Sequence, residues 1–175
     1  MFDVTIEPGD LIHCDIGIND QYVQPHTDMQ WVAYILREGE KQAPQDLQAL
    51  LDCGNRFRQI VMENMHVGKE GNAVFTAAMR QAKAEGIQPM LYSHPVGTFG
   101  HGAGPIIGLY TNQGFVPGTG ERTIEEDTCF ALELNVYDNI SCWDGQRVFM
   151  YLEENICRAA ENDYIDGHQT KLLLI

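Results

Sequence analysis

The sequence predicts a single α+β domain in which helices pack on one face of a curved sheet. Its 175 residues have the length of one domain, so we expect residues 1–175 to form one unit. Two extended runs come first along the chain, two segments with helical spacing follow, and three extended runs close it. Strands gathered around a block of helices are typical of α+β proteins.

The first two extended runs are expected to pair. Residues 10–18 (DLIHCDIGI) alternate, so that Ile12, Cys14 and Ile16 share one face and Asp15 lies on the other with His13. A second run within residues 22–36 ends in WVAYIL and is followed by a turn sequence, Arg-Glu-Gly-Glu. These features favour an antiparallel pair of strands.

Two helices are expected next. Pro44 suits the first turn of a helix, apolar residues recur behind it at helical spacing, and Gly68 is a stop signal. A second helix is predicted for residues 72–85, with Gly86 as its C-terminal cap. The apolar stripe of each helix is interpreted as a core face.

A stretch rich in glycine and proline, residues 93–120, is expected to be a long loop. Long loops inside a compact domain are usually functional or disordered, and this one contains His94 and His101. Three strands are predicted after it, at residues 128–137, 147–156 and 171–175.

Composition excludes several classes of function. The formal net charge of −14 disfavours binding to nucleic acid, which requires Lys and Arg. No apolar run reaches the roughly 18 residues that cross a bilayer, and the first residues carry no signal core, so we expect a soluble, cytoplasmic protein without a membrane partner. The five cysteines include no C-x-x-C pair, which argues against a disulfide framework or a zinc–cysteine site.

Acidic residues stand where core side chains are expected. Asp15 and Glu133 interrupt apolar strands, and Glu153 ends another. A buried carboxylate must be paired, protonated or bound to metal, and several on one sheet repel each other unless a cation lies between them. Strand parity excludes Glu153 and Glu154 from entering the same site. Parity does not choose between His26 and Asp28, which share a face.

Five elements occur in a characteristic order along nearly the whole chain. They are Asp15-Ile16-Gly17, Thr27-Asp28-Met29-Gln30, His94-Pro95-Val96-Gly97-Thr98-Phe99-Gly100-His101, Leu132-Glu133-Leu134 and Leu152-Glu153-Glu154. Each is weak alone, but the ordered set resembles the catalytic domain of the M24 metallopeptidases, the group of methionine aminopeptidase, aminopeptidase P and prolidase. The resemblance implies the "pita-bread" fold, a curved and mostly antiparallel sheet with helices on one face.

The resemblance also implies a two-metal site and a role for each residue. The metal ligands would be Asp15, Asp28, His94, Glu133 and Glu153. Glu153 would bridge the ions and Glu133 would also relay a proton, while His101 would not ligate but would stabilise the developing oxyanion. Two divalent ions about 3.5–4 Å apart can share a water and make it hydroxide near neutral pH. The donor set suits Mn²⁺ or Co²⁺, with Zn²⁺ and Fe²⁺ as alternatives.

The sequence departs from the family pattern in three places. Asp28 follows Asp15 by two positions more than is usual, and the usual spacing falls on His26; we assign Asp28 because Thr-Asp-Met-Gln is similar to the family element. His101 is followed by Gly102 where many members have Glu, so substrate contacts are expected to differ. Asp15 lies close to the first residue, so the N-terminal helices of the family fold are expected to be missing.

The resemblance implies hydrolysis of an N-terminal or Xaa-Pro peptide bond, with a peptide as substrate and with the homodimer common in the family. Glycine-rich sequence around His94 is closer to aminopeptidase P and prolidase than to methionine aminopeptidases. Two alternatives stay open. One is a non-peptidase or inactive relative with the same fold, and the other is a fragment that needs a missing N-terminal part. His94 and His101 also have a plain alternative, as loop histidines bonded to the backbone.

Overall fold

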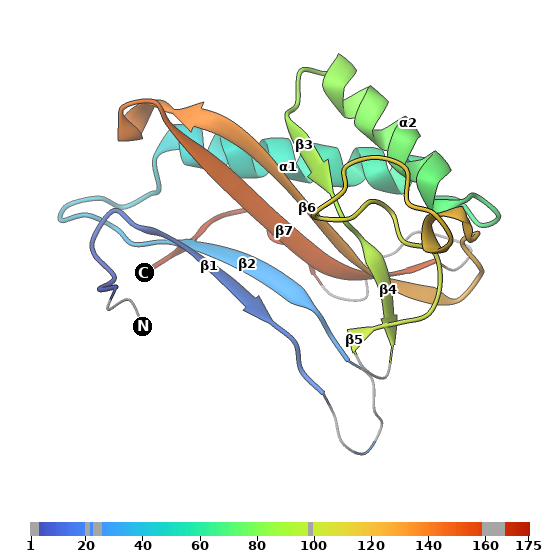
Figure 1. Ribbon diagram of the computed structural model, residues 1–175. Coiled ribbons are helices and arrows are strands. Elements are labelled where there is room, and N and C mark those ends of the chain that lie inside the picture. Colours follow the sequence, from blue (N-terminus) through green and yellow to red (C-terminus); the bar gives the residue numbers. More distant parts are fainter. Residues whose placement is uncertain (1–3, 20–21, 23–25, 98–99, 159–166) are drawn as a thin grey trace.

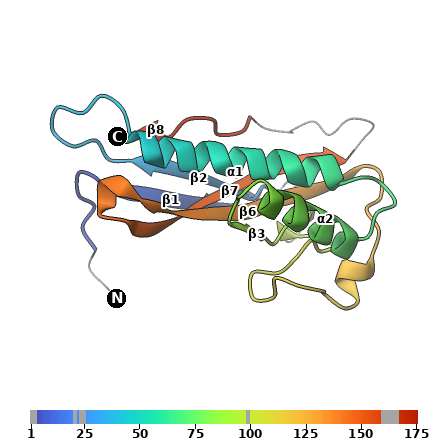
Figure 2. The ribbon, with the colours of Figure 1, turned by 90° about the horizontal axis from the view of Figure 1, so that it is seen from above.

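The computed structural model describes residues 4–19, 22, 26–97, 100–158 and 167–175. Its described strands form one sheet in the order β1-β2-β7-β6-β4-β5, with β3 added to β6 and β8 added to β2. Figure 1 shows the long β6–β7 hairpin at the centre of this curved sheet, with α1 running behind it. Seen from above in Figure 2, α1 covers one side of the sheet along its length.

The β6–β7 hairpin forms the centre of the sheet. Strands β6 (Thr128–Ile140) and β7 (Gln146–Arg158) pair antiparallel along their whole length, and a short 3-10 turn, η2 (Ser141–Trp143), joins them. Asp144 and Gly145 both have positive φ, which closes the reversal. Glu133 and Glu153 are direct cross-strand partners within this hairpin.

Shorter strands extend the sheet on both sides. Strand β2 (Met29–Tyr34) joins β7 and pairs antiparallel with β1 (Leu11–Ile16), as the alternating runs predict. On the other side β3 (Pro89–Leu91) and β4 (His94–Gly97) both pair with β6, and β5 (Gly100–His101) pairs with β4. The last strand, β8 (Leu173–Leu174), lies parallel to β2.

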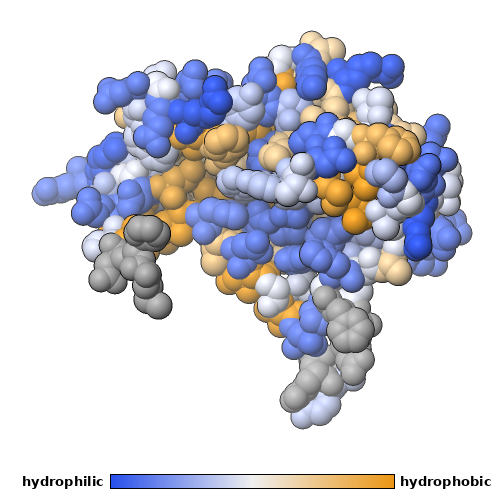
Figure 3. Space-filling model, in the orientation of Figure 1, coloured by the Kyte–Doolittle hydropathy of each residue, from blue (hydrophilic) through white to orange (hydrophobic). Residues whose placement is uncertain are grey.

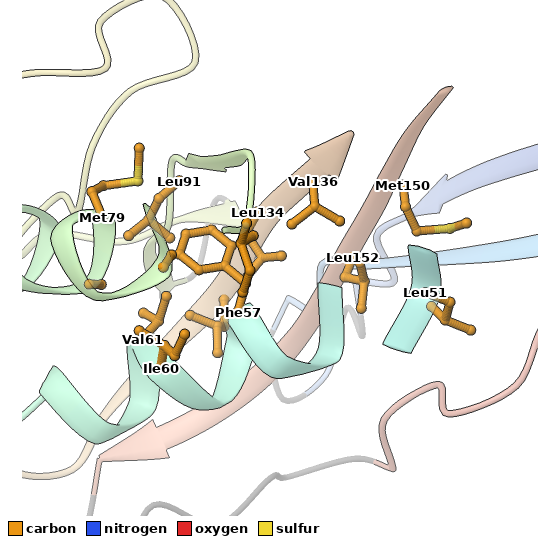
Figure 4. Close-up of a cluster of buried hydrophobic side chains, with 14 of the residues drawn as sticks. Leu51, Phe57, Ile60, Val61, Met79, Leu91, Leu134, Val136, Met150 and Leu152 are labelled. Atoms are coloured by element: carbon orange, nitrogen blue, oxygen red, sulfur yellow. The ribbon is translucent and has the colours of Figure 1, made fainter. Parts of the chain in front are cut away.

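The two predicted helices are present. Helix α1 (Gln45–Asn64) starts directly after Pro44, and α2 (Gly71–Ala84) packs on α1 and β3. The core lies between α1 and the β6–β7 hairpin, where Phe57 and Ile60 lie near Leu134 in Figure 4. A Cβ at Gly54 would lie only 2.5 Å from Cδ1 of Leu152, so this glycine permits the close approach of helix and sheet.

The prediction that residues 93–120 form one long loop is wrong in part. His94 lies in β4 and His101 lies in β5, and β3 just before them was also missed. These strands are short and rich in glycine and proline, so they carry no alternating pattern. Their backbone hydrogen bonds with neighbouring strands hold them in place instead, as in the pairs His94–Ala131 and Val96–His101.

One row of residues crosses four strands on the sheet face opposite α1. Asp15 pairs with Gln30, Gln30 pairs with Glu153, and Glu153 pairs with Glu133. Directly opposite residues on neighbouring strands share a face, so the four side chains lie side by side. Figure 3 views the molecule from the side shown in Figure 1, with hydrophilic residues across its middle and hydrophobic ones beside them.

Candidate metal centre and active site

The predicted ligands converge on this row. Asp15 comes from β1, Asp28 from the residue before β2, Glu133 from β6, Glu153 from β7 and His94 from the start of β4. Their ligand atoms form three overlapping groups, in each of which all atoms lie within 4.8 Å of one another: Asp28–His94–His101, His94–Glu133–Glu153 and Asp15–Asp28–Glu153. Predicted ligands more than a hundred residues apart in sequence therefore meet in one cluster.

Glu153 is the buried centre of the cluster. Its side chain is 1% exposed, and neither carboxylate oxygen has a hydrogen-bond partner among the described residues. Burial, and then the negative charges of Glu133, Asp28 and Asp15, raise its pKa to about 9 against the opposing effect of the nearby Gln30 side chain. A cation at this position would remove both the desolvation cost and the repulsion, so the residues present fit a metal site.

The two carboxylate oxygens of Glu133 have different surroundings. The Nε2 of Gln30 donates to its Oε1 over 2.7 Å, while its Oε2 lies 3.9 Å from Nε2 of His94. Burial, with the nearby charges of Asp28 and Asp15, raises the pKa of Glu133 to about 7 against the opposing effect of Gln30. Because Gln30 is bonded to Oε1, Oε2 is the carboxylate oxygen that can bind a cation or accept a proton.

His94 presents one nitrogen to the cluster. Its Nδ1 lies 3.0 Å from the carbonyl oxygen of Pro95, so Nδ1 carries the proton and Nε2 is left as a ligand atom. Burial lowers the pKa of His94, which favours the neutral, ligating form. Its Nε2 lies 3.8 Å from Oδ2 of Asp28, too long for a hydrogen bond and wide enough for an ion between them.

Asp28 is held in place by Asn155. The amide N–H of Asp28 donates to Oδ1 of Asn155 over 3.4 Å, and Nδ2 of Asn155 donates to the carbonyl oxygen of Asp28 over 3.2 Å. His26 is close enough to influence the pKa of Asp28 but belongs to none of the three groups. Most of the turn that contains the two extra positions lies outside the described residues.

Glu154 faces away from the cluster, as strand parity predicts. Its Oε1 accepts a hydrogen bond from Nη1 of Arg58 on α1 over 2.7 Å, and both side chains are buried. The two adjacent glutamates therefore have different environments. Glu154 is neutralised by a fixed cation of the protein, whereas Glu153 has none among the described residues.

An apolar pocket of about 420 Å³ opens beside the cluster. His94, His101, Gly102 and Glu133 line one side, and Tyr92, Ile106, Leu109 and Tyr110 line the rest. The rings of Tyr92 and Tyr110 meet edge to face at 5.2 Å, and Nδ2 of Asn135 donates to the hydroxyl of Tyr92 over 3.2 Å. The pocket has the size and polarity to hold an uncharged side chain next to the ligand atoms.

His101 stands at the mouth of this pocket. Its ring lies edge-on to His94, with centroids 4.0 Å apart, and the side chain is exposed. It also belongs to the group with Asp28 and His94, so its position fits a ligand as well as the predicted donor to substrate.

Several polar partners in the site were missed by sequence reasoning. Gln30 orients Glu133, and His13 in turn orients Gln30, its Nε2 lying 2.9 Å from Oε1 of that residue. Asn155 fixes Asp28, and Tyr92 lines the pocket. Strand parity could have indicated two of these residues, because Gln30 shares a face with Asp28 and Asn155 shares a face with Glu153.

The chain matches the metallopeptidase family M24 over residues 3–158. It therefore belongs to this family, as the ordered motifs predict. Among curated proteins, a sequence comparison finds no match. In the part of the chain that the structure describes, no helix has both the length and the apolar character needed to cross a membrane.

Solved structures confirm the pita-bread fold. An X-Pro aminopeptidase from Thermotoga maritima superposes with a TM-score of 0.70 at 17% identity, covering 97% of this chain and 43% of that one. The dipeptidase PepE from Mycobacterium ulcerans gives 0.71 at 16% identity, covering 99% and 42%. The N-terminal domain of the FACT complex subunit SPT16 from Eremothecium gossypii gives 0.70 at 12% identity, covering 97% and 37%. The chain thus spans less than half the length of these structures.

Proposed function

We propose that this chain carries the dinuclear metal site of a peptidase that hydrolyses an N-terminal or Xaa-Pro peptide bond. The observation that carries the proposal is the convergence of ligand atoms around Glu153, whose buried carboxylate has no hydrogen-bond partner among the described residues. Membership of a metallopeptidase family supports the same reading.

The donor set is consistent with two divalent ions. The four carboxylates of Asp15, Asp28, Glu133 and Glu153 would offset the +4 charge of the ions, and the neutral Nε2 of His94 would complete the set. Oxygen donors with one imidazole favour Mn²⁺ or Co²⁺, with Zn²⁺ and Fe²⁺ as further candidates. When bound, the ions would polarise the carbonyl of the substrate and supply a hydroxide-like water.

The chain's own groups would orient the substrate and move the proton. Glu133 Oε1 is fixed by Gln30, so Oε2 would take a proton from the nucleophile and pass it to the leaving amine. His101 would donate a hydrogen bond to the carbonyl oxygen as negative charge develops there. The pocket beside both residues would bind one substrate side chain and exclude water around it.

The pocket also supports a preference among peptides. Tyr92, Ile106, Leu109 and Tyr110 offer ring faces and aliphatic carbons, and no Lys or Arg is among the described residues that line the pocket. An uncharged, compact side chain such as the proline ring suits these walls better than an acidic one. Similar folds named as X-Pro aminopeptidase and dipeptidase point to the same substrate class.

The test is a peptide assay on the metal-loaded chain. Purified protein would be loaded with Mn²⁺ and incubated with Xaa-Pro dipeptides and longer Xaa-Pro peptides, beside the same peptides with Asp in place of Pro. We expect metal-dependent release of the N-terminal residue from the proline peptides, and its loss in Glu133→Gln. Bound metal without any cleavage would contradict the peptidase proposal.

A second candidate is a binding role that does not require hydrolysis. It is favoured by the similarity to the N-terminal domain of a FACT complex subunit and by the exposure of Asp15, which leaves one side of the ligand cluster open. A binding titration with the same peptides, run beside the cleavage assay, separates the two candidates. A chain that binds peptide with micromolar affinity but does not cleave it in the presence of Mn²⁺ would fit the binding role.

A further inference from the structure

Two cysteines face each other across the β6–β7 hairpin. Cys129 and Cys157 are direct cross-strand partners, between the pairs Thr128–Arg158 and Phe130–Ile156. The Cβ atoms of directly opposite residues in an antiparallel pair lie about 4.5–5.5 Å apart, and a disulfide needs about 3.5–4.5 Å. A small local adjustment therefore brings the two sulfur atoms within bonding distance.

Both thiols are accessible and close enough to interact with each other. Both cysteines are free thiols and half-buried, so small reagents can reach them. Burial, followed by a hydrogen bond with the Cys157 thiol, raises the pKa of Cys129 to about 11. A raised pKa leaves little thiolate at Cys129 near neutral pH, so Cys129 is assigned the second, intramolecular step of the exchange, in which the attacked sulfur is already held opposite it.

The other cysteines have no such partner. Cys14 lies in β1 opposite Trp31, Cys53 lies in α1, and Cys142 lies in the η2 turn, where its amide N–H donates to Asp46. Within the described strands, Cys129–Cys157 is the one register pair formed by two cysteines.

We propose that Cys129 and Cys157 form a reversible redox site that exchanges with a low-molecular-weight disulfide such as glutathione disulfide. In the first step the Cys157 thiolate attacks one sulfur of glutathione disulfide, and one glutathione thiolate leaves. In the second step the Cys129 thiolate attacks the mixed disulfide at Cys157 and releases the second glutathione. The two protein thiols are oxidised, glutathione disulfide is reduced, and the two protons appear on the glutathione thiols.

The position of the pair gives the modification a structural consequence. Cys129 and Cys157 lie at the open end of the hairpin, far from the η2 turn, on the same face as Glu133 and Glu153. Between the cysteines and those glutamates lies the pair Ala131–Asn155. A disulfide would fix the two strands at the end where the turn does not constrain them.

The experiment is a redox titration of the whole chain. The reduced protein would be equilibrated in glutathione buffers of increasing oxidising strength, trapped with an alkylating reagent, digested with trypsin and analysed by mass spectrometry. Because the tryptic peptide 123–147 contains both Cys129 and Cys142, the titration would use Cys142→Ser beside the wild type. Fragmentation of the linked peptide assigns the sulfur in the wild type, so the result does not depend on the variant folding.

We expect a cross-link between peptides 123–147 and 148–158, with the loss of two hydrogen atoms in mass and full reversal by dithiothreitol. The oxidised chain should melt several degrees higher than the reduced chain, on the order of 4–8 °C. In Cys129→Ser, Cys157 should stop at its mixed disulfide with glutathione. Two unlinked thiols, or separate mixed disulfides on both cysteines at the oxidising end, would overturn the proposal. The inference is independent of the proposed peptidase function.

Discussion

Gln30 and Glu133 are joined by a 2.7 Å hydrogen bond that links β2 to β6 across the intervening strand β7. Gln30 is buried, and its other amide atom, Oε1, lies 2.9 Å from Nε2 of His13. A chain of contacts from β1 through β2 thus fixes one carboxylate oxygen on β6.

Replacing Gln30 by Leu is expected to weaken metal binding by about 10–100-fold, because the ligand Glu133 loses the partner that orients it. The pKa of Glu133 should also rise further, since the bond to Gln30 lowers it. Isothermal titration with Mn²⁺ measures the affinity. Gln88→Leu, an exposed glutamine bonded to Tyr137, is the matched control. Equal affinities in the two variants would show that Gln30 is not a positioning residue.

The metal-free chain should lose stability as the pH rises. The pKa values of Glu133 and Glu153 are raised to about 7 and about 9, so both carboxyls favour the protonated form in the folded state. Groups with raised folded pKa values stabilise the fold at low pH, and this contribution is lost as the pH passes from about 4.5 up through those values. Thermal melts in EDTA between pH 7 and pH 9 should show a falling Tm, because the opposing contribution of neutral, buried His94 is already complete at the lower end of this range.

Two additions to the same melts isolate the cause. Glu153→Gln should flatten the pH dependence, and excess Mn²⁺ should reverse it by neutralising the cluster. A Tm of the metal-free chain that rises steadily across this range would contradict the electrostatic description of the site.

The buried pair Arg58–Glu154 should act as one unit in stability. Arg58→Met leaves the Glu154 carboxylate buried without its guanidinium and is expected to cost about 3–5 kcal/mol. Adding Glu154→Gln should recover much of that loss, because the uncompensated charge is removed. Urea unfolding of both single variants and the double variant measures the coupling. Additive losses would show that the pair is not coupled.

Tyr110 is expected to determine substrate affinity more than turnover. Its ring forms one wall of the apolar pocket beside Glu133, so Tyr110→Ala should raise KM about tenfold and change kcat little. Phe115→Ala is the control, because Phe115 is a similarly exposed aromatic residue nearby in the chain that does not line the pocket. Equal KM values for the two variants would show that the pocket does not bind the substrate.

The sequence could predict the long elements because each carries its own periodic pattern. Residues of β6, β7 and α1 alternate or recur as their structures require, and the ordered acidic motifs lead to Asp15, Glu133 and Glu153. Strands β3, β4 and β5 could not be found this way. They are short, and they depend on pairing: β3 and β4 pair with β6, which is remote in sequence, and β5 pairs only with β4 among the described strands.

From the sequence alone, only the candidate metal ligands of the site could be predicted. Gln30, Asn155 and Tyr92 acquire their roles from residues as much as 127 positions away, a relationship that no local pattern encodes. The choice of Asp28 over His26 likewise rested on a motif. The structure adds the contact with Asn155 that holds Asp28 beside Glu153.

Elemental analysis of the purified, Mn²⁺-loaded chain tests the metal centre most directly, with Asp28→Ala and His26→Ala measured in parallel. A dinuclear site that includes Asp28 should give close to two ions per wild-type chain, a clear loss in Asp28→Ala and little change in His26→Ala. Near-zero metal in a well-folded wild-type chain would contradict it, as would a loss confined to His26→Ala.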